Sequence, residues 1–146
     1  MAYSSKLTLD GKDYNVQDCD YEFSQAVDLN GKPCAYPRGG LINFTVITPI
    51  GTVFHKWMFD ISEVKDGEFI FLISDGTQQT IKKVAFQKAH CIRLAENFNN
   101  YTATHMTMKV TISAGIISFN DGTAVYTNNE LLEFIATERQ RSAAGY

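Results

Sequence analysis

The fold of this chain is decided by the segment Asp10-Gly11-Lys12-Asp13-Tyr14-Asn15-Val16-Gln17-Asp18-Cys19-Asp20-Tyr21-Glu22-Phe23-Ser24-Gln25-Ala26-Val27-Asp28-Leu29-Asn30-Gly31-Lys32-Pro33-Cys34-Ala35-Tyr36-Pro37-Arg38-Gly39-Gly40. It opens with Asp-Gly, which is a strong signal for a tight β-hairpin turn. A long stretch with the alternation typical of a strand follows. A loop from Asn30 to Gly40, rich in glycine and proline, then separates this strand from the next one.

Partway along the alternating stretch, the apolar residues switch from even-numbered to odd-numbered positions. Its even apolar positions are Tyr14 and Val16, and its odd ones are Cys19, Tyr21, Phe23 and Val27. Because successive side chains point to opposite faces of a strand, this change requires a bulge or a break. We expect a strand from Tyr14 to Val27 with a bulge near Gln17-Asp18, and such bends help a sheet to curl into a barrel.

Further stretches have the pattern of strands. They cover residues 6–9, 41–48, 68–74, 80–98 and 105–119, and Asp75-Gly76 is expected to turn the chain between two of them. Strands at short spacing, joined by glycine turns and accompanied by one helix, predict a mainly β fold. The expected architecture is a small antiparallel barrel or sandwich.

The stretches at 41–48 and 68–74 are apolar on both faces. One face of each strand covers the core of its own barrel, and the other needs a helix, the C-terminal tail or another subunit to cover it. We therefore predict self-association, with Phe69, Phe71 and Ile73 as candidate residues of the subunit interface. The alternative is a monomer whose core covers both faces.

Residues 52–61 are predicted to form a short helix. Its apolar stripe consists of Val53, Phe54, Trp57, Met58 and Ile61, which fall at helical spacing. We expect the stripe to cover one mouth or side of the barrel, with Phe54, Trp57 and Met58 making the packing contacts.

A second short helix is expected from about Asn129 to Arg141. It follows Thr127-Asn128-Asn129-Glu130, which resembles a capping box. We treat residues 1–119 as the barrel domain and residues 120–146 as a C-terminal extension that is not a separate domain.

The composition is that of one globular domain. The chain has 146 residues, of which 45% are hydrophobic and 20% charged, and a net charge of −3. The negative charge argues against a nucleic-acid partner, and the apolar runs are too short for a membrane span. The first residues lack the pattern of a secretory signal peptide, so assembly in the cytoplasm is expected. The cysteines Cys19, Cys34 and Cys91 are expected to be reduced thiols.

The sequence contains no pattern typical of an enzyme or of a cofactor or metal site. His90 and Cys91 are adjacent on a predicted strand, so they point to opposite faces and do not share a metal. Gly39-Gly40 precedes a strand rather than a helix, so it does not present a helix N-terminus to phosphate. Several carboxylates cluster around one turn, as is usual for a solvent-exposed surface, so the cluster does not indicate a catalytic site. We therefore predict no catalysis, no cofactor and no metal.

Several short motifs occur in an order that resembles one known family. Within the opening segment they include Asn30-Gly31-Lys32-Pro33 and Gly39-Gly40, and beyond it Trp57-Met58-Phe59-Asp60, Phe86-Gln87-Lys88-Ala89-His90-Cys91, Glu96-Asn97-Phe98, Met106-Thr107 and Ile112-Ser113-Ala114. They resemble the tube proteins of type VI secretion systems, the Hcp family, in the form called TssD found in Bacteroidetes. His90 stands where that family more often has tyrosine. The resemblance covers residues 6–119, and the tail from residue 120 departs from it.

The resemblance implies a structural role. Members of the family form six-membered rings of split β-barrels with one helix, and the rings stack into a tube that carries the spike and effectors. In the family, the loop between the second and third strands reaches the adjacent ring. The residues implied for that contact are Asn30, Lys32, Pro33, Tyr36 and Arg38. The implied partners are other copies of the chain, the spike and sheath components, and effector cargo that the machine exports from the cell.

Two other functions are compatible with the sequence. One is the tube of a phage-like tail or a related contractile injection particle, which shares the fold. The other is a monomeric barrel that binds a small apolar ligand. An open cavity would favour small or polar inward residues, whereas the rows expected to point inward contain mainly Phe, Ile, Met and Val, which favours a packed core.

Overall fold

The computed structural model describes residues 2–74, 79–98 and 106–143. Its elements are β1 (Ala2–Leu9), β2 (Lys12–Tyr21), β3 (Leu41–Ile47), α1 (Val53–Phe59), β4 (Lys65–Ser74), β5 (Gln79–Asn97), β6 (Thr107–Phe119), β7 (Ala124–Thr127) and α2 (Asn129–Ala143). The predicted Asp75-Gly76 turn and His105, the start of the predicted last strand, lie outside the described residues.

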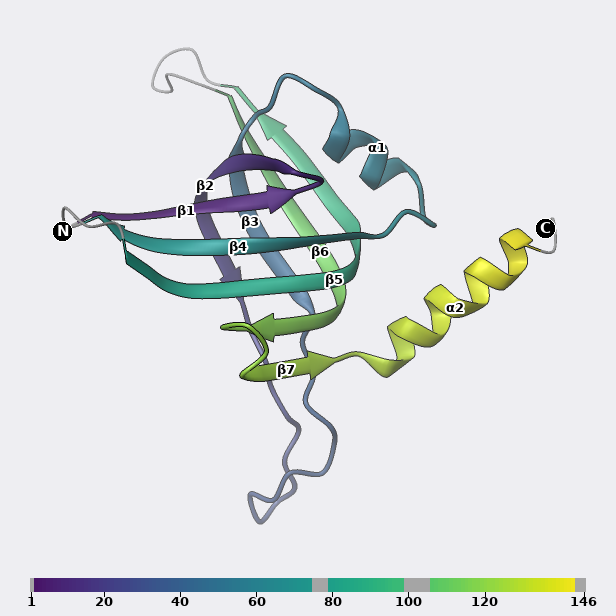
Figure 1. Cartoon of the computed structure of the whole chain (residues 1–146). Coiled ribbons are helices and arrows are strands. Elements are labelled where there is room, and N and C mark those ends of the chain that lie inside the picture. Colours follow the sequence, from purple (N-terminus) through teal and green to yellow (C-terminus); the bar gives the residue numbers. More distant parts are fainter. Residues whose placement is uncertain (1, 75–78, 99–105, 144–146) are drawn as a thin grey trace.

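The strands form one antiparallel sheet that closes on itself (Figure 1). The strand order is β3-β2-β1-β4-β5-β6-β7, and pairing of β3 with β6 closes a barrel of six strands. One edge of β6 pairs with β5. Its other edge pairs with β3 over Thr107–Ser113 and with β7 over Ile116–Phe119. The prediction of a mainly β, antiparallel barrel with a short helix and a C-terminal helix is confirmed.

The opening segment forms the predicted hairpin and bulge. Asp10 and Gly11 have φ angles of 52° and 76°, the left-handed conformation that a tight hairpin turn requires. The pairing of β2 with β3 shifts register between Val16 and Asp18, which confirms the bulge. The strand ends at Tyr21 rather than at Val27, because beyond Tyr21 the chain leaves the barrel.

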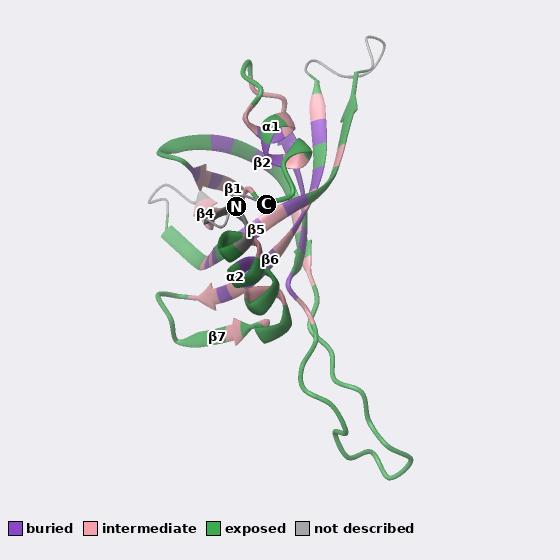
Figure 2. Ribbon diagram, turned by 90° about the vertical axis from the view of Figure 1, so that its right-hand side faces the viewer, coloured by how far each residue is buried: buried purple, intermediate pink, exposed green. Residues whose placement is uncertain are grey.

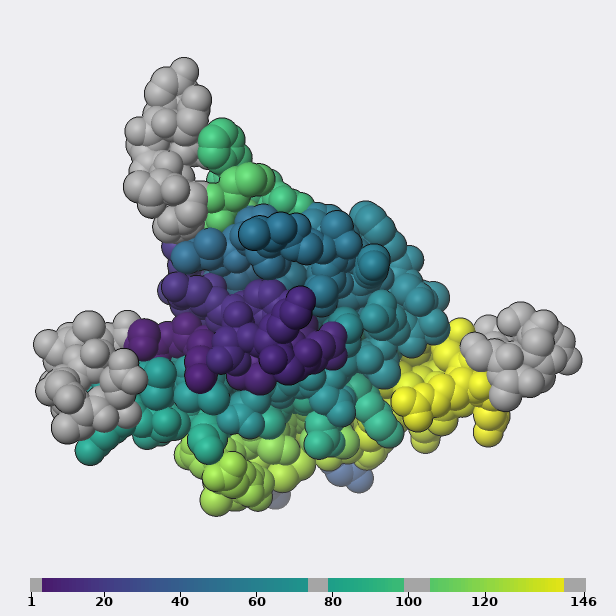
Figure 3. Space-filling model, turned by 45° about the horizontal axis from the view of Figure 1, so that its top comes forward, coloured from purple at the N-terminus to yellow at the C-terminus, as the bar shows by residue number. Residues whose placement is uncertain are grey.

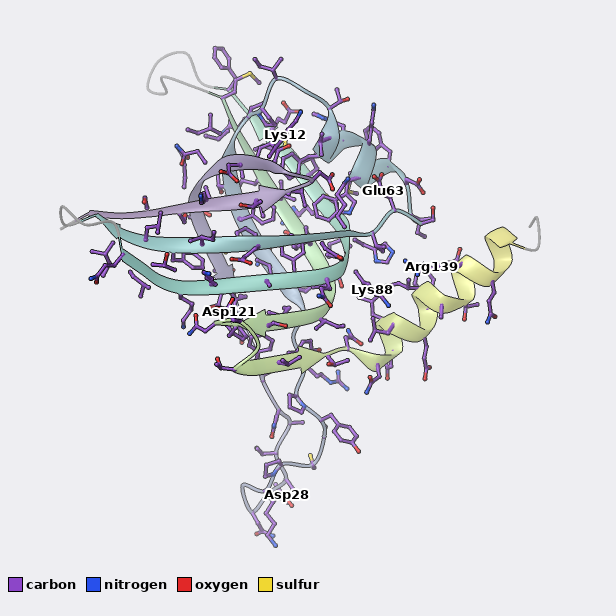
Figure 4. The ribbon with its side chains drawn as sticks, in the orientation of Figure 1. Lys12, Asp28, Glu63, Lys88, Asp121 and Arg139 are labelled. Atoms are coloured by element: carbon purple, nitrogen blue, oxygen red, sulfur yellow. The ribbon has the colours of Figure 1, made fainter. Side chains whose placement is uncertain are left out.

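The closed sheet is made of two smaller, continuous sheets whose strands run across one another (Figure 1). We call one of them the wall sheet; it comprises residues 16–21 of β2, β3, residues 107–113 of β6 and residues 91–97 of β5. β5 and β6 are long enough to continue into the second sheet, and they bend together near Lys88 (Figure 4). Lys88 has a φ of 52°, and its backbone N–H donates to Asp66 Oδ1 at 2.8 Å, which fixes the bend.

Helix α1 contributes to the core as predicted. Phe54 and Trp57 are fully buried, and Met58 packs partly buried against the same cluster. The Trp57 indole N–H donates to the Ala89 carbonyl oxygen at 3.0 Å, so its polar atom is satisfied inside the barrel. The placement of Ile61 on the helical stripe was wrong, because the helix ends at Phe59 and Ile61 is 72% exposed in the following connection.

The C-terminal segment adds a strand before its helix. β7 was not predicted, and it pairs with β6, so the sheet continues past residue 119 and only α2 lies outside it. The N-cap side chain is Asn128 rather than Thr127: its Oδ1 accepts from Leu131 N–H at 3.1 Å. Ile135 is buried against the barrel, whereas the end of α2 extends beyond the body of the molecule (Figure 3).

Candidate assembly surfaces

An arm of residues 22–40 projects from one end of the barrel, between β2 and β3 (Figure 1). Its two sides pair through Ser24 and Arg38, whose backbone N–H groups donate to each other's carbonyl oxygens at 2.9 and 2.6 Å. A further bridge joins Val27 and Pro33. The arm is therefore an ordered, irregular hairpin, although almost all of it is exposed (Figure 2).

The tip of the arm is organised by Asp28 (Figure 4). One oxygen of its carboxylate, Oδ1, accepts from the backbone N–H groups of Asn30 and Lys32 at 2.9 and 3.0 Å. The Asp28 N–H in turn donates to the Lys32 carbonyl at 2.8 Å. This Asx-type turn holds the tip in one shape without any contact to the barrel.

The base of the arm is anchored by aromatic rings. Phe23 lies 5.1 Å from the Tyr126 ring and 5.9 Å from the Phe119 ring, measured between centroids. Tyr21 completes the cluster at 6.0 Å from Phe23. These contacts link the arm to β2, β6 and β7, so the direction in which the arm leaves the barrel is fixed.

The five residues predicted for the inter-ring contact all lie on this arm. Asn30 and Lys32 belong to the tip, and Pro33, Tyr36 and Arg38 to the returning side. Tyr36 is 90% exposed and Leu29, which was not predicted, is 105% exposed. Apolar side chains this exposed on an ordered hairpin are typical of a docking surface.

The opposite end of the barrel also exposes apolar side chains. Ile50 lies in the β3–α1 connection, and Phe98 and Met106 flank the β5–β6 connection (Figure 1). The Thr48 N–H donates to the Met106 carbonyl oxygen at 3.0 Å, so the start of the β3–α1 connection lies beside the residue that precedes β6. Both ends of the barrel therefore expose apolar side chains.

The outer face of the wall sheet forms one side of the molecule, and none of the other described elements covers it (Figure 2). The sequence suggested that β3 is apolar on both faces, yet only Leu41 and Ile47 at its two ends are apolar on this face. The polar residues Asn43 and Thr45 lie between them. The Thr45 hydroxyl donates to Asp18 Oδ1 at 3.0 Å. The face is thus a polar surface crossed by side-chain hydrogen bonds.

The wall sheet has two strand edges that no described strand pairs. On β2, pairing with β1 ends at Val16, so residues 18–21 pair only with β3. On β5, pairing with β4 ends at Ala89, so residues 90–97 pair only with β6. Unpaired edges offer backbone N–H and C=O groups to another strand.

The burial of Phe69 on β4 corrects the prediction that this residue lies in the subunit interface. Phe69 is fully buried, and its ring centroid lies 5.0 Å from that of Phe44. Phe71 packs partly buried against the same core. These side chains point into their own barrel, because they alternate with Ile70 and Leu72 on the outer face, so Phe69 is not available to a neighbouring subunit. Ile73 is half-buried, and its role stays a prediction.

The three cysteine thiols and His90 lie in different environments. Burial raises the pKa of Cys19 to about 12, with further contributions from the Asp20 and Asp18 carboxylates, and burial raises that of Cys91 to about 11. Cys34 is exposed on the arm. Burial lowers the pKa of His90, whose ring lies 6.1 Å from that of Phe134 on α2.

The described residues contain no group of three or more His, Cys, Asp or Glu side chains that could hold a metal ion. No helix among them is long and apolar enough to cross a membrane. The barrel interior is filled by large side chains, chiefly Trp57, Phe44, Phe54, Phe69 and Phe86. This packing leaves the surfaces, rather than an internal site, as the candidates for function, and it does not favour the small-ligand barrel.

Comparison with known proteins identifies the family of this chain. The family model for hemolysin coregulated protein Hcp (TssD) matches residues 1–129, which include β7. A search of curated proteins found no match. Hcp1 from Flavobacterium johnsoniae is similar at 33% identity and a TM-score of 0.77, covering 86% of this chain and 99% of that one.

Two more distant structures share the fold. Hcp1 from Salmonella typhimurium has 11% identity and a TM-score of 0.66, covering 87% of this chain and 93% of that one. The secreted protein Hcp3 from Pseudomonas aeruginosa has 11% identity and a TM-score of 0.59, covering 86% and 98%. The family consists of structural tube proteins rather than enzymes. This chain therefore belongs to the Hcp (TssD) family and is a type VI secretion tube protein.

Proposed function

We propose that the chain forms closed rings through the edges of its wall sheet and that these rings stack into a tube. The observation that carries the proposal is the pair of unpaired edges, on β2 and β5. The wall sheet has four strands, each antiparallel to its neighbour, so its two outer strands run in opposite directions. A copy rotated about an axis along the strands can therefore place its β2 beside β5 as another antiparallel pair.

Such a contact is head-to-tail, and head-to-tail contacts generate rings when the rotation closes. The uncovered polar face of the wall sheet would then line the lumen. The number of subunits is expected to be six, as in the rest of the family. Since each contact joins different edges, every subunit in a ring would be equivalent.

Stacking would use the two ends of the barrel. The arm presents Leu29 and Tyr36 at one end, and the other end exposes Ile50, Phe98 and Met106. In a head-to-tail stack, the arm of one ring would cover the apolar end of the next. The ordered tip of the arm favours this contact, because an ordered arm loses little conformational entropy on docking.

We infer the remaining roles from family membership. The tube would assemble in the cytoplasm with spike and sheath components and leave the cell with effector cargo. In a producing strain, this predicts that the protein appears in the culture medium only while the sheath is intact.

The ring proposal is tested by light scattering on a size-exclusion column, with negative-stain images of the same peak. Ile92→Lys changes the β5 edge, and Val125→Lys is the control on β7, outside the wall sheet; the two side chains are 46% and 58% exposed. We expect rings from the wild type and from Val125→Lys, and monomers from Ile92→Lys. A wild type that stays monomeric at high concentration would overturn the proposal.

A further inference from the structure

A single row of polar side chains crosses the outer face of the wall sheet from edge to edge. Asp20 on β2 is paired with Asn43 on β3, and Asn43 with Thr111 on β6. Thr111 is in turn paired with Arg93 on β5. Because directly paired residues share a face of the sheet, the row runs without interruption from one free edge to the other.

Hydrogen bonds connect the first three members of the row. The Asn43 amide Nδ2 donates to Asp20 Oδ1 at 2.9 Å, and the Thr111 hydroxyl donates to Asn43 Oδ1 at 2.6 Å. These bonds fix the orientation of the Asn43 amide and hold the Asp20 carboxylate in place at the β2 edge. The row therefore begins with an ordered anion.

The two ends of the row carry opposite charges without a partner of opposite sign among the described residues. No salt bridge of the described chain includes Asp20 or the Arg93 guanidinium. Asp18, two residues before Asp20, adds a second carboxylate at the same edge. Both side chains at the ends of the row are exposed. The β2 edge is thus acidic and the β5 edge basic on the same face.

We propose that Arg93 of one copy binds the Asp20 carboxylate of the adjacent copy, an inference that rests on the proposed ring. When β2 of the second copy pairs with β5 of the first, the acidic end of one row meets the basic end of the next. The rows then join into a polar belt around the inside of the ring. This contact selects one register for the joint, because a slip along the strands separates the two charges.

The expected strength of each contact is modest. An exposed ion pair shifts an equilibrium by only a few-fold, whereas like charges placed opposite one another are unfavourable by a similar or larger factor. Every joint of the ring repeats the contact, so reversing one charge affects all joints at once. Salt screens exposed charges, so ring formation should weaken as ionic strength rises.

The test compares three variants by light scattering across a dilution series. Arg93→Glu places like charges at the joint, and we expect the concentration needed for rings to rise by roughly tenfold or more. Lys12→Glu is the matched control: it makes the same change from positive to negative charge on an exposed residue of β2, in the half that pairs with β1. Arg93→Glu combined with Asp20→Arg restores opposite charges and should recover most of the loss. Circular dichroism verifies that each monomer folds.

A cross-link supplies an independent measurement. Paired side chains on neighbouring strands are close enough for a disulfide, whereas residues shifted by two positions are not. In a Cys34→Ser background, Asp20→Cys with Arg93→Cys should yield covalent multimers on a non-reducing gel. Asp18→Cys with Arg93→Cys should yield far fewer, and the opposite preference would overturn the proposed register.

The outcomes separate this inference from the proposed function. Wild-type rings that persist unchanged in Arg93→Glu would overturn the ion pair and leave the ring standing. A monomeric wild type would overturn both. Loss of rings in Arg93→Glu, recovery in the double variant and unchanged rings in Lys12→Glu would together support the contact.

Discussion

Gly67 illustrates how tightly single residues are fitted where the barrel strands meet. A Cβ atom at this position would lie 2.6 Å from Phe86 Cζ and 2.9 Å from the Thr8 carbonyl oxygen. The Thr8 oxygen belongs to the backbone of β1, which pairs with β4 there, so it cannot move away easily. Gly67 is therefore required for close approach rather than for a special backbone angle.

We predict that Gly67→Ala lowers the free energy of unfolding by about 1–3 kcal/mol, the usual cost of overpacking a core. Gly51→Ala is the control, because nothing lies within 4 Å of its Cβ position. Urea denaturation followed by circular dichroism measures both variants. Equal stability of the two would contradict the close approach seen at Gly67.

The thiols provide a test of burial at the residue scale. Thiolate is the reactive form, and the raised pKa values of Cys19 and Cys91, about 12 and about 11, keep these residues protonated at neutral pH. We predict that a maleimide probe at neutral pH labels Cys34 fast, and that Cys34→Ser removes this phase. Mass spectrometry after timed quenching identifies the labelled residue. Fast labelling of Cys91 in the native protein would contradict its burial.

The same pKa shifts affect stability at high pH. The unfolded chain loses these thiol protons near the usual value of 9.0, whereas the folded chain holds them to about 11 and about 12. Above pH 9 the folded state therefore binds more protons than the unfolded state, and stability decreases as pH rises. Substituting Cys91→Ala should reduce this slope, as measured by urea denaturation between pH 8 and about 10.

At the scale of elements, local patterns predicted most of the strands and both helices. Alternation located the bulge between Val16 and Asp18, because a parity change is visible in the sequence itself. β7 was missed, since its four residues are too few to establish a period and its pairing with β6 is a tertiary feature. Ile61 was misplaced because helical spacing alone does not reveal that α1 ends at Phe59.

Ile135 is the buried side chain through which α2 docks on the barrel, and Phe134 adds a ring contact to His90. Ile135 is 5% exposed, and the Asn128 N–H donates to the Gly115 carbonyl oxygen at 2.8 Å, so the start of the helix is held against β6. We predict that Ile135→Asp releases α2 while the barrel stays folded, because an unpaired charge is costly to bury. Ala136→Asp, on the exposed side of the helix, is the control.

Hydrogen exchange measured by mass spectrometry distinguishes the two variants. Peptides from residues 129–143 should exchange at least tenfold faster in Ile135→Asp, with β5 and β6 unchanged. The same loss of protection in Ala136→Asp would mean that helix propensity, and not docking, orders α2.

At the scale of the whole molecule, the sequence predicted the arm but not the surfaces of the wall sheet. Residues 30–40 are marked as a loop by glycine and proline, and the residues predicted for the contact lie together on one projection (Figure 1), while the contact itself stays a prediction. The free edges at residues 18–21 and 90–97 depend on where β1 and β4 stop pairing, and that is set by closure of the barrel. Asp20 and Arg93 are far apart in the sequence, so no local pattern connects them.

The arm can be tested without touching the fold. Leu29 and Tyr36 are 105% and 90% exposed, so they contribute almost nothing to the stability of one chain. If they dock on the next ring, replacing both removes apolar contact area from every ring-to-ring joint, and each buried apolar side chain contributes roughly 1.5–3 kcal/mol. We predict that Leu29→Ser with Tyr36→Ser leaves the unfolding midpoint and the ring unchanged but shortens the stacks.

Negative-stain images of stack length at matched concentration measure this effect. Ile61→Ser is the control, because Ile61 is also exposed but lies in the α1–β4 connection, away from both ends of the barrel. Deleting residues 32–38 should give the stronger version of the same result, with rings intact and stacking lost. A deletion product that fails to fold would show that the arm is needed for folding. Unchanged stacks in the double variant would exclude Leu29 and Tyr36 as the ring-to-ring contact.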